Sequence, residues 1–339
     1  CEQARKENRN IYTAFIDYKK AYDSVPHSWL CKILELYKID TKICTFLKCS
    51  MEFWKTTLQI TLNEQTIQSD PIMIRRGIFQ GDSLSPLWFC LAINPLSDIL
   101  NSCNYGFNIR INKQRENRIS HLLYMDDIKI YASTQNQLTN LLNLTEQFSG
   151  DIGMSFGIEK CKTQAIRKGV QHQVPHITQN NEIIEAQERN DTYKYLGFCQ
   201  SSHINHTKTK TQLKDQYLAR LKLILKTQLN GKNLMKAVNT FCVPLLTYSF
   251  GVIKWSKTDL ENLNIATRKI FTQYRRHHPK SSIERFSLPR QNGGRGFQNL
   301  ENLYQRQISD LKKYFLKRAE RNEMFRTITR ADLNHTPLN

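Results

Sequence analysis

The chain has 339 residues, enough for one large or two medium domains that fold without disulfide or metal staples. Hydrophobic residues make up 40% of it, so we expect neither an integral membrane protein nor a disordered tail. The most apolar stretch, residues 237–253, is interrupted by Asn239, Pro244 and Thr247 and falls short of a spanning helix.

Positive charge is concentrated in the C-terminal part of the chain. Lys and Arg total 49 against 30 Asp and Glu, which gives a formal net charge of +19. Residues 200–339 hold 26 basic and 9 acidic residues, so almost all of the excess lies there. Such an excess is typical of a protein that binds a polyanion, most commonly nucleic acid. A solvated basic face or an anionic membrane surface is the alternative interpretation.

The nine cysteines form no C-x-x-C pair, and an odd number cannot all pair within one chain. This usage predicts a reducing, intracellular compartment and argues against a zinc ribbon. We expect no signal peptide. The first residue is Cys1 and not Met, already within a helical pattern, so we expect a piece of a longer protein.

The N-terminal region is predicted to mix strands and helices. Residues 11–17 alternate in polarity and are bounded by charge, which predicts a strand that ends on Asp17. Apolar residues at helical spacing predict a helix over 27–38. Residues 55–77 predict a hairpin whose polar turn is Glu64–Gln65.

The middle of the chain places an acidic pair between two strands. A helix with a mostly apolar face is predicted over 84–100, with Asp82 or Ser83 as its N-cap. Residues 119–133 predict a hairpin with Asp126 and Asp127 at its tip. The elements predicted next are a helix over 135–149, a strand near 161–166 and a short strand over 193–198.

From residue 208 onward the pattern becomes helical and basic, so a boundary near 200–210 is predicted to separate an α+β domain from a mainly helical one. Four lysines lie at near-helical spacing on the first of these helices: Lys210, Lys214, Lys222 and Lys226. A second basic cluster follows: Arg275, Arg276, His277 and His278. A single cation of this kind is typically solvated, so only their sum indicates nucleic-acid binding.

Three aspartates are predicted to carry chemistry. Asp17 ends a strand, and the adjacent Asp126 and Asp127 repel one another at a tight turn unless a cation neutralises them. Carboxylate oxygens suit Mg²⁺, and two such ions about 3.5–4 Å apart can stabilise an in-line phosphoryl displacement. The alternative is that the acidic pair simply caps a turn.

Five segments then occur in a fixed order: FIDYKKAYDSVPH (15–27), RGIFQGDSLSP (76–86), YMDD (124–127), GMSFGIEKCKT (153–163) and YKYLGF (193–198). Together they resemble the palm motifs of reverse transcriptases. The segments QGDSLSP and AYDSVPH resemble those of the non-long-terminal-repeat (LINE-type) retrotransposon enzymes. Within that class, the resemblance is closest to the site-specific, early-branching group. The segment LPRQNGGRGF (288–297) is similar to the thumb region of that group.

The resemblance implies an α+β fold: a right-hand polymerase palm, with an antiparallel sheet and flanking helices, followed by a mainly helical basic thumb. The implied domains are a palm with partial fingers over 1–205 and a thumb with a C-terminal extension over 206–339. Only sixteen residues precede Asp17, so the fingers are expected to be largely missing.

The resemblance also implies the catalytic residues. Asp17, Asp126 and Asp127 correspond to the metal-binding carboxylates, and the backbone carbonyl of Tyr18 to a further metal contact. Two Mg²⁺ ions are implied, with Mn²⁺ as an alternative. Lys160 matches the lysine that protonates the leaving pyrophosphate, a task for which Lys162, two residues on, competes.

The same resemblance implies the substrate contacts. Tyr22 matches an aromatic steric gate that excludes a 2′-hydroxyl, although a core aromatic is the other interpretation. Gln80 and Gly81 match contacts to the incoming nucleotide, and Arg76 a contact to phosphate. The primer grip corresponds to Tyr195, Leu196 and Gly197. Gly157 departs from the family, whose members often carry Asn there.

The implied function is an RNA-directed DNA polymerase of a retrotransposon that extends a primer 3′ end. Its implied partners are an RNA template, a DNA primer and deoxynucleoside triphosphates, and no membrane is expected. Upstream fingers and downstream nuclease regions are expected in a parent polyprotein. We expect a ribonucleoprotein of the nucleus and cytoplasm. The alternatives are an inactive nucleic-acid-binding remnant, a group II intron maturase-like enzyme, or an RNA-directed RNA polymerase, which Tyr22 disfavours.

Overall fold

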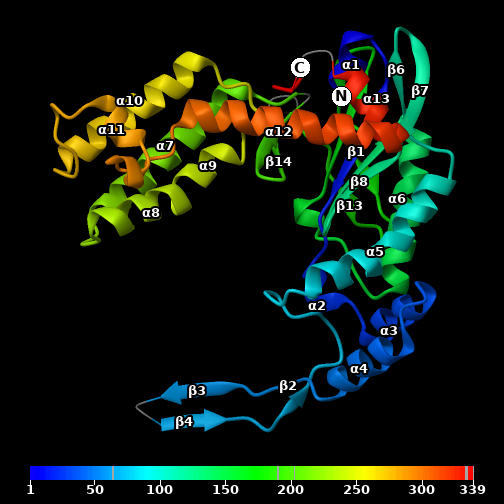
Figure 1. Ribbon diagram of the computed structural model, residues 1–339. Coiled ribbons are helices and arrows are strands. Elements are labelled where there is room, and N and C mark those ends of the chain that lie inside the picture. Colours follow the sequence, from blue (N-terminus) through cyan, green and yellow to red (C-terminus); the bar gives the residue numbers. More distant parts are fainter. Residues whose placement is uncertain (63–64, 189–190, 202, 333–334, 339) are drawn as a thin grey trace. The chain divides into compact units, whose positions relative to one another are not determined.

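The computed structural model describes residues 1–62, 65–188, 191–201, 203–332 and 335–338 (Figure 1). The chain divides into two compact units. The first comprises residues 1–108 and 118–203, and the second residues 109–117 and 204–339. Within these described ranges, no helix is long and apolar enough to cross a bilayer.

The first unit is built on a five-stranded antiparallel sheet whose strand order is β11-β10-β1-β9-β8. The strands are β1 (Ile11–Ile16), β8 (His121–Tyr124), β9 (Asp127–Ala132), β10 (Lys162–Arg167) and β11 (Val170–His172). All six residues of β1 are buried, because it lies between β9 and β10 and is covered on both faces. The predicted strand before Asp17, the hairpin around the acidic pair and the strand near 161–166 are confirmed.

Helices cover one face of this sheet (Figure 1). They are α5 (Ser85–Ser102) and α6 (Gln135–Asp151), and α3 (His27–Leu36) packs against α5. Alternate residues of β1 and β9, such as Ala14 and Ile130, form the core with Phe89 of α5 and Leu141 of α6. Each fully buried side chain of the larger kind contributes about 1.5–3 kcal/mol, so this face supplies much of the stability of the unit.

Local chemistry sets the ends of these helices. The predicted N-cap of α5 is wrong: the helix begins at Ser85 with Leu84 at the cap position. Asp82 Oδ1 accepts a hydrogen bond from the Leu84 backbone N–H at 2.8 Å, so its carboxylate fixes the preceding turn instead. Helix α3 ends at Leu36, two residues early, because Lys38 adopts a left-handed backbone with φ 53°. Three short helices complete the N-terminal region: α1 (Glu2–Lys6), α2 (Ala21–Ser24) and α4 (Thr41–Glu52).

The predicted hairpin over 55–77 forms two successive two-stranded ribbons. The strands are β2 (Lys55–Thr56), β3 (Gln59–Leu62), β4 (Gln65–Gln68) and β5 (Ile72–Met73), paired as β2–β5 and β3–β4. Of its predicted turn, Glu64 lies outside the described residues and Gln65 begins β4. The apolar side chains of this ribbon, such as Ile60 and Ile67, are exposed.

The predicted single strand over 193–198 is instead a hairpin. Leu196 and Gly197 have φ values of 46° and 80°, the two left-handed positions of a tight two-residue turn. Sequence alternation could not show this turn, because only one of its two positions is glycine. The small strands of the chain are β6 (Phe107–Ile111), β7 (Gln114–Ile119), β12 (His176–Ile177), β13 (Ile183–Ile184), β14 (Tyr193–Tyr195) and β15 (Phe198–Gln200).

The second unit is mainly helical, as predicted. Its helices are α7 (His206–Leu225), α8 (Gly231–Phe241), α9 (Val243–Thr247), α10 (Lys257–Gln273), α11 (Ile283–Ser287), α12 (Leu300–Arg321) and α13 (Glu323–Ala331). Tyr217, Leu221, Phe250 and Phe271 are fully buried within it. The apolar stretch near Pro244 is divided between α8 and α9, in keeping with the expectation that it forms no spanning helix.

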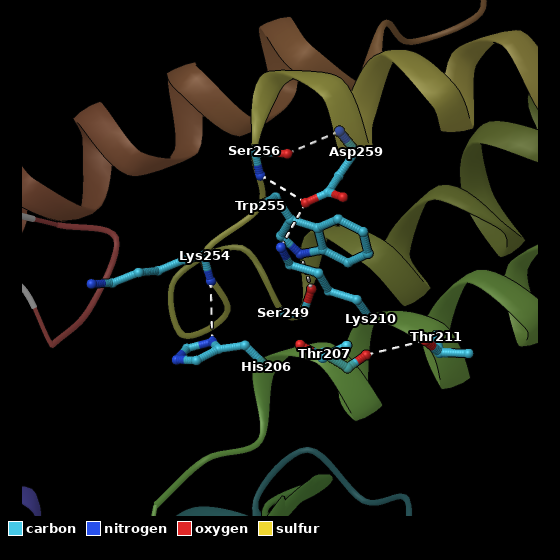
Figure 2. A network of polar contacts seen from close by, with 9 residues as sticks. All are labelled: His206, Thr207, Lys210, Thr211, Ser249, Lys254, Trp255, Ser256 and Asp259. Atoms are coloured by element: carbon cyan, nitrogen blue, oxygen red, sulfur yellow. Dashed lines mark hydrogen bonds and ion pairs between the residues drawn. The ribbon is translucent and has the colours of Figure 1, made fainter.

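A polar network ties α7 to the start of α10 (Figure 2). Ser256 and Asp259 form a reciprocal capping box at the N-terminus of α10. The Lys210 ammonium of α7 pairs with Asp259 Oδ2 at 2.6 Å and lies 5.7 Å from the centre of the Trp255 ring. The Trp255 indole in turn donates to Ser249 Oγ at 2.9 Å. Lys210, one of the four lysines that the sequence places at near-helical spacing, therefore helps to hold this unit together.

Candidate active site

Asp17 and Asp127 lie side by side at one end of the central sheet. The register pairs Ile16 of β1 with Ile128 of β9, so the next position along β1 stands opposite the first residue of β9. Asp17 is the residue directly after β1, and Asp127 opens β9. Two carboxylates from segments 110 positions apart are thus brought together by strand pairing.

Asp126 is held in the turn that joins β8 to β9. Tyr124 pairs with Asp127, so Met125 and Asp126 form a two-residue hairpin loop. Met125 adopts a left-handed backbone with φ 54°, a conformation that favours glycine. Its sulfur lies 3.7 Å from the Tyr22 hydroxyl and 3.6 Å from Cys90 Sγ. Backbone strain of this kind is concentrated at functional sites, where it positions a side chain.

The three carboxylates form one concentration of negative charge. Burial, and then the neighbouring charges of Asp126 and Asp17, raise the pKa of Asp127. Burial and the Asp126 charge also raise the pKa of Tyr22. Charges of one sign influence each other in this way only when they are close and poorly screened. The sequence prediction that these aspartates converge is consistent with this arrangement.

One cation faces the carboxylates directly. The Lys160 ammonium lies 3.4 Å from Asp17 Oδ1 and remains largely exposed to solvent. Lys162, its competitor in the sequence, instead pairs with Glu185 at 2.6 Å. The structure therefore brings Lys160 and not Lys162 to the acidic cluster.

Backbone contacts hold Asp17 beside the segment that carries Lys160. The Gly157 N–H donates to the Asp17 carbonyl at 2.8 Å, and the Asp17 N–H donates to Cys161 Sγ at 3.5 Å. A Cβ at position 157 would lie 3.4 Å from Asp17 Oδ1, so glycine leaves this side of the carboxylate open. The residue that departs from the family pattern is therefore in contact with the first aspartate.

Tyr22 lies in α2, beside the turn of the acidic pair. Its ring stacks on Phe89 of α5 with 4.8 Å between centroids and 10° between planes. Its hydroxyl donates to the Met125 sulfur. The side chain is partly buried and in contact with the core, as the core-aromatic interpretation expects, and the steric gate stays a prediction.

A family model of the reverse transcriptase (RNA-dependent DNA polymerase) matches residues 1–199, more than half of the chain. The chain belongs to the reverse transcriptase family. The matched range ends within β15 and contains all five of the segments identified in the sequence. It covers most of the first unit, including the carboxylates, Lys160 and Tyr22.

Curated relatives of this chain come from retrotransposable elements. It is 25% identical over 309 residues to the retrovirus-related Pol polyprotein from type-1 retrotransposable element R2 of Nasonia vitripennis, covering 88% of this chain and 28% of the relative. It is 28% identical over 199 residues to that of Popillia japonica, covering 57% of this chain and 27% of the relative. The chain spans about a quarter of these relatives' length. The predicted resemblance to the reverse transcriptases of non-long-terminal-repeat retrotransposons is confirmed.

Solved structures of telomerase share a distant likeness with this chain. An apo telomerase from Candida tropicalis aligns over 98% of this chain and 52% of its own, at 13% identity and a TM-score of 0.39. That TM-score is too low to support a conclusion about the fold or the function. The α+β fold class is confirmed by the strands and helices of the chain itself.

The remaining predicted nucleotide contacts lie in the loop before α5. Gln80 and Gly81 are both exposed, and Gly81 has φ 98° with open space where a Cβ would stand. Arg76 is engaged elsewhere: its Nη2 donates to the Gly153 carbonyl at 3.0 Å and links the second motif to the fourth. In the described residues, neither Gln80 nor Gly81 forms a hydrogen bond with the carboxylates.

The predicted primer-grip turn packs beside the same carboxylates. Tyr195 is buried at the end of β14, and burial together with the Asp127 charge raises its pKa to about 12. Tyr193 stacks on Phe15 with 4.3 Å between centroids. Its pKa is raised by burial and by charges that include Asp17 and Asp127. Sequence reasoning did not single out Tyr193, although the motif YKYLGF contains it.

Lys129 is a second residue that the sequence did not reveal. It is buried two residues after Asp127 in β9, and this burial lowers its pKa to about 8. Its ammonium donates to Gln200 Oε1 at 2.9 Å and lies 4.5 Å from the Phe15 ring centre and 5.4 Å from that of Tyr195. The alternation of β9 was the available signal, because it puts Lys129 on the face of Asp127.

The site offers hard oxygen ligands to a metal ion. Across the described ranges, no three Asp, Glu, His or Cys side chains are placed so that they could hold one ion together. Mg²⁺ does not need such a cage, because it is typically bound by one or two carboxylates together with waters and substrate phosphates. The charge that raises the pKa of Asp127 fits a divalent cation at this place. Tyr18 can contribute only its backbone, since its buried hydroxyl is hydrogen-bonded to Ser149.

Proposed function

We propose that this chain is the polymerase part of a retrotransposon reverse transcriptase, which extends a primer 3′ end with deoxynucleotides on an RNA template. The observation that supports this most strongly is the cluster of Asp17, Asp126 and Asp127, joined by pairing of β1 with β9. Membership of the family and the retrotransposon relatives support the same assignment.

The proposed metal ligands are Asp17, Asp126, Asp127 and the Tyr18 carbonyl. Bound there, two Mg²⁺ ions, with Mn²⁺ as an alternative, would supply charge stabilisation for the phosphoryl transfer. The chain itself contributes the position of the carboxylates: rigid strands fix Asp17 and Asp127, and the strained Met125 turn fixes Asp126. Such fixed electrostatics act without reorganisation at the moment of reaction.

Lys160 is proposed as the general acid that protonates the leaving pyrophosphate. Its ammonium is exposed and lies 3.4 Å from Asp17. The alternative residue, Lys162, is paired with Glu185, and this favours Lys160 for the role. General-acid assistance of this kind is worth about 10²–10⁴-fold in rate.

Tyr22, Gln80 and Gly81 are proposed as the contacts to the incoming nucleotide. The Tyr22 ring is fixed by its stacking on Phe89, so it can exclude a 2′-hydroxyl by steric clash. Gly81, without a Cβ, lets the backbone approach the nucleotide. Arg76 is proposed to bind phosphate through the guanidinium nitrogens that Gly153 does not engage.

The turn of Tyr195, Leu196 and Gly197 is proposed as the primer grip. We further propose that residues 1–205 form the palm with partial fingers and residues 206–339 the basic thumb. The thumb would bind the RNA–DNA hybrid through its backbone phosphates, with an affinity that falls steeply with salt. In this proposal the chain works within a longer polyprotein, as a ribonucleoprotein of the nucleus and cytoplasm.

Primer extension tests the proposed activity. The chain is incubated with a DNA primer on an RNA template, Mg²⁺ and deoxynucleotides, beside Asp126→Asn, which keeps the shape of the side chain. We expect extension by the wild type and a loss of roughly 10²–10³-fold in the variant, since the metal contact is worth several kcal/mol.

Two outcomes would contradict the proposal. Equal extension by wild type and Asp126→Asn would mean that the carboxylates are not catalytic. No extension by either, with salt-sensitive binding of the hybrid intact, would favour the inactive nucleic-acid-binding remnant instead.

A further inference from the structure

A cavity of about 780 Å³ lies in the second unit, among the C-terminal end of α10, the turn after it, and the segment 285–295. Five arginines line it: Arg275, Arg276, Arg285, Arg290 and Arg295. None of the described residues in its lining is acidic. Its volume falls within the range of about 300–1,000 Å³ that is usual for small-ligand sites.

Among the described residues, the five arginines of this arginine cavity have no anionic partner. In the described ranges none of the five forms an ion pair. Arg276 Nη2 donates to the Thr227 carbonyl at 2.7 Å, and Arg295 donates to the Arg276 carbonyl. Two guanidinium groups are therefore held in place by neutral acceptors while their charge stays uncompensated.

Neighbouring groups report the same excess of positive charge. Burial lowers the pKa of His277, and four surrounding cations, Arg295 first among them, lower it further. Burial and the charges of Arg290 and Arg285 also lower the pKa of Arg295. Positively charged groups that lower one another's pKa in this way are stabilised by a bound anion.

The wall of the cavity also leaves room for a ligand. At Gly231, which begins α8 with an ordinary φ, an added Cβ would meet no atom within 4 Å. Packing therefore does not require glycine at this position. Because glycine has no side chain, the space beside it stays open. His277, His278 and the planar guanidinium groups offer faces on which a nucleobase can stack.

We propose that the arginine cavity binds the phosphates of a single-stranded nucleic-acid segment of one or two nucleotides. Duplex phosphates lie along a convex ridge, whereas cations on several walls of a hollow surround a phosphate that enters it. Only a strand that is free to bend out of a duplex can enter in this way. The proposal goes beyond polymerisation and needs no catalysis, so it holds whether or not the carboxylates extend a primer.

Fluorescence anisotropy with a short oligouridylate, labelled at its 3′ end and measured over a range of KCl concentrations, tests the proposal. The cavity variant is Arg275→Gln/Arg285→Gln/Arg290→Gln, which changes exposed side chains without hydrogen bonds among the described residues. The control variant removes the same charge from the exposed lysines of α12, as Lys312→Gln/Lys313→Gln/Lys317→Gln.

We expect the cavity variant to bind the strand about tenfold or more weakly, with a salt slope reduced by about 0.7–1.4, because one or two phosphates are no longer neutralised. The control variant should stay within about twofold of wild type, because scattered surface cations contribute little each. Gly231→Phe, which fills the cavity without changing charge, should weaken binding as well. Equal losses in the cavity and control variants would overturn the proposal.

Two further probes separate the sources of phosphate. If an RNA–DNA duplex without overhangs loses as much affinity as the single strand in the cavity variant, the proposal of a single-strand site is overturned. If calorimetry shows that inorganic tripolyphosphate binding is lost in the cavity variant while strand affinity is unchanged, the cavity binds free polyphosphate and the proposal fails.

Discussion

The two units of this chain gather charge of opposite sign in opposite ways. In the first unit three carboxylates lie at the ends of paired strands, and Lys160 faces them. In the second unit five arginines surround a cavity whose described lining contains no acidic residue. Clusters of like charge disfavour the charged state of their members, so each cluster marks a place where a ligand of opposite charge is expected.

The supports of the two clusters differ as well. Asp17 and Asp127 are fixed by the buried ladder of β1 and β9, which suits a site where small displacements reduce the reaction rate. Arg285 and Arg290 stand on a short helix and a 3₁₀ turn, exposed to solvent. Precise geometry serves chemistry, whereas binding of a flexible strand tolerates adaptable side chains.

Removing the cation that faces the carboxylates has the largest expected effect. Lys160→Ala should lower the rate of single-nucleotide addition about 10²-fold or more, since it removes the proposed general acid. Lys162→Ala should leave that rate nearly unchanged, because Lys162 is paired with Glu185. Rapid-quench kinetics with both variants measures the difference. A larger loss in Lys162→Ala would reverse the assignment.

Sugar selectivity should separate the two units. Tyr22→Ala is expected to raise ribonucleotide incorporation roughly tenfold or more, because the clash with the 2′-hydroxyl disappears. The arginine cavity contacts phosphates, so RNA and DNA strands of the same sequence should bind it about equally. Incorporation assays with Tyr22→Ala and Tyr22→Phe test the first part. Unchanged selectivity in Tyr22→Ala would remove Tyr22 from the gate.

Among the residues that the structure describes, Lys129 is the buried cation near the carboxylates. Its replacement tests whether it positions the primer-grip turn. Lys129→Met removes the contact with Gln200 and the cation–π contact with Tyr195. A loss of about 1 kcal/mol in holding the hairpin corresponds to a roughly fivefold higher KM for primer–template. We expect kcat to change less. A fall in kcat alone would point to a role in the chemical step instead.

The smallest expected effect concerns stability. Asp127→Asn should raise the free energy of unfolding by less than about 1 kcal/mol, because it removes a charge that burial, and then the charges of Asp126 and Asp17, disfavour at a site that is still partly open to solvent. Arg290→Gln should change stability by less, since Arg290 is exposed. Urea denaturation of both variants measures the contrast. A destabilised Asp127→Asn would show that the carboxylate also holds the fold.

Much of the first unit was predictable from sequence because its signals are local. Alternation gave β1 and the hairpin of the acidic pair, and helical spacing gave α5 and α6. The family motifs then grouped the carboxylates that strand pairing brings together. Alternation predicted a single strand over 193–198, and only the resemblance indicated a turn at Tyr195–Gly197, since a leucine with positive φ is set by tertiary contacts and not by local preference.

The parts that escaped prediction depend on contacts distant in sequence. The link from Arg76 to Gly153 joins two motifs, and the burial of Lys129 depends on β14 and β15. The basic cluster at Arg275 was visible in the sequence, but only the fold brings Arg285 and Arg295 to it. No periodicity in the chain encodes such a cavity.

The left-handed backbone of Met125 has a consequence for directed evolution. Gly or Asn would adopt φ 54° at lower energetic cost, so a library selected for thermal tolerance should enrich them at this position. A library selected for catalytic output should keep methionine, whose sulfur contacts Tyr22 and Cys90. The two selections are therefore expected to drive one position of this chain in opposite directions.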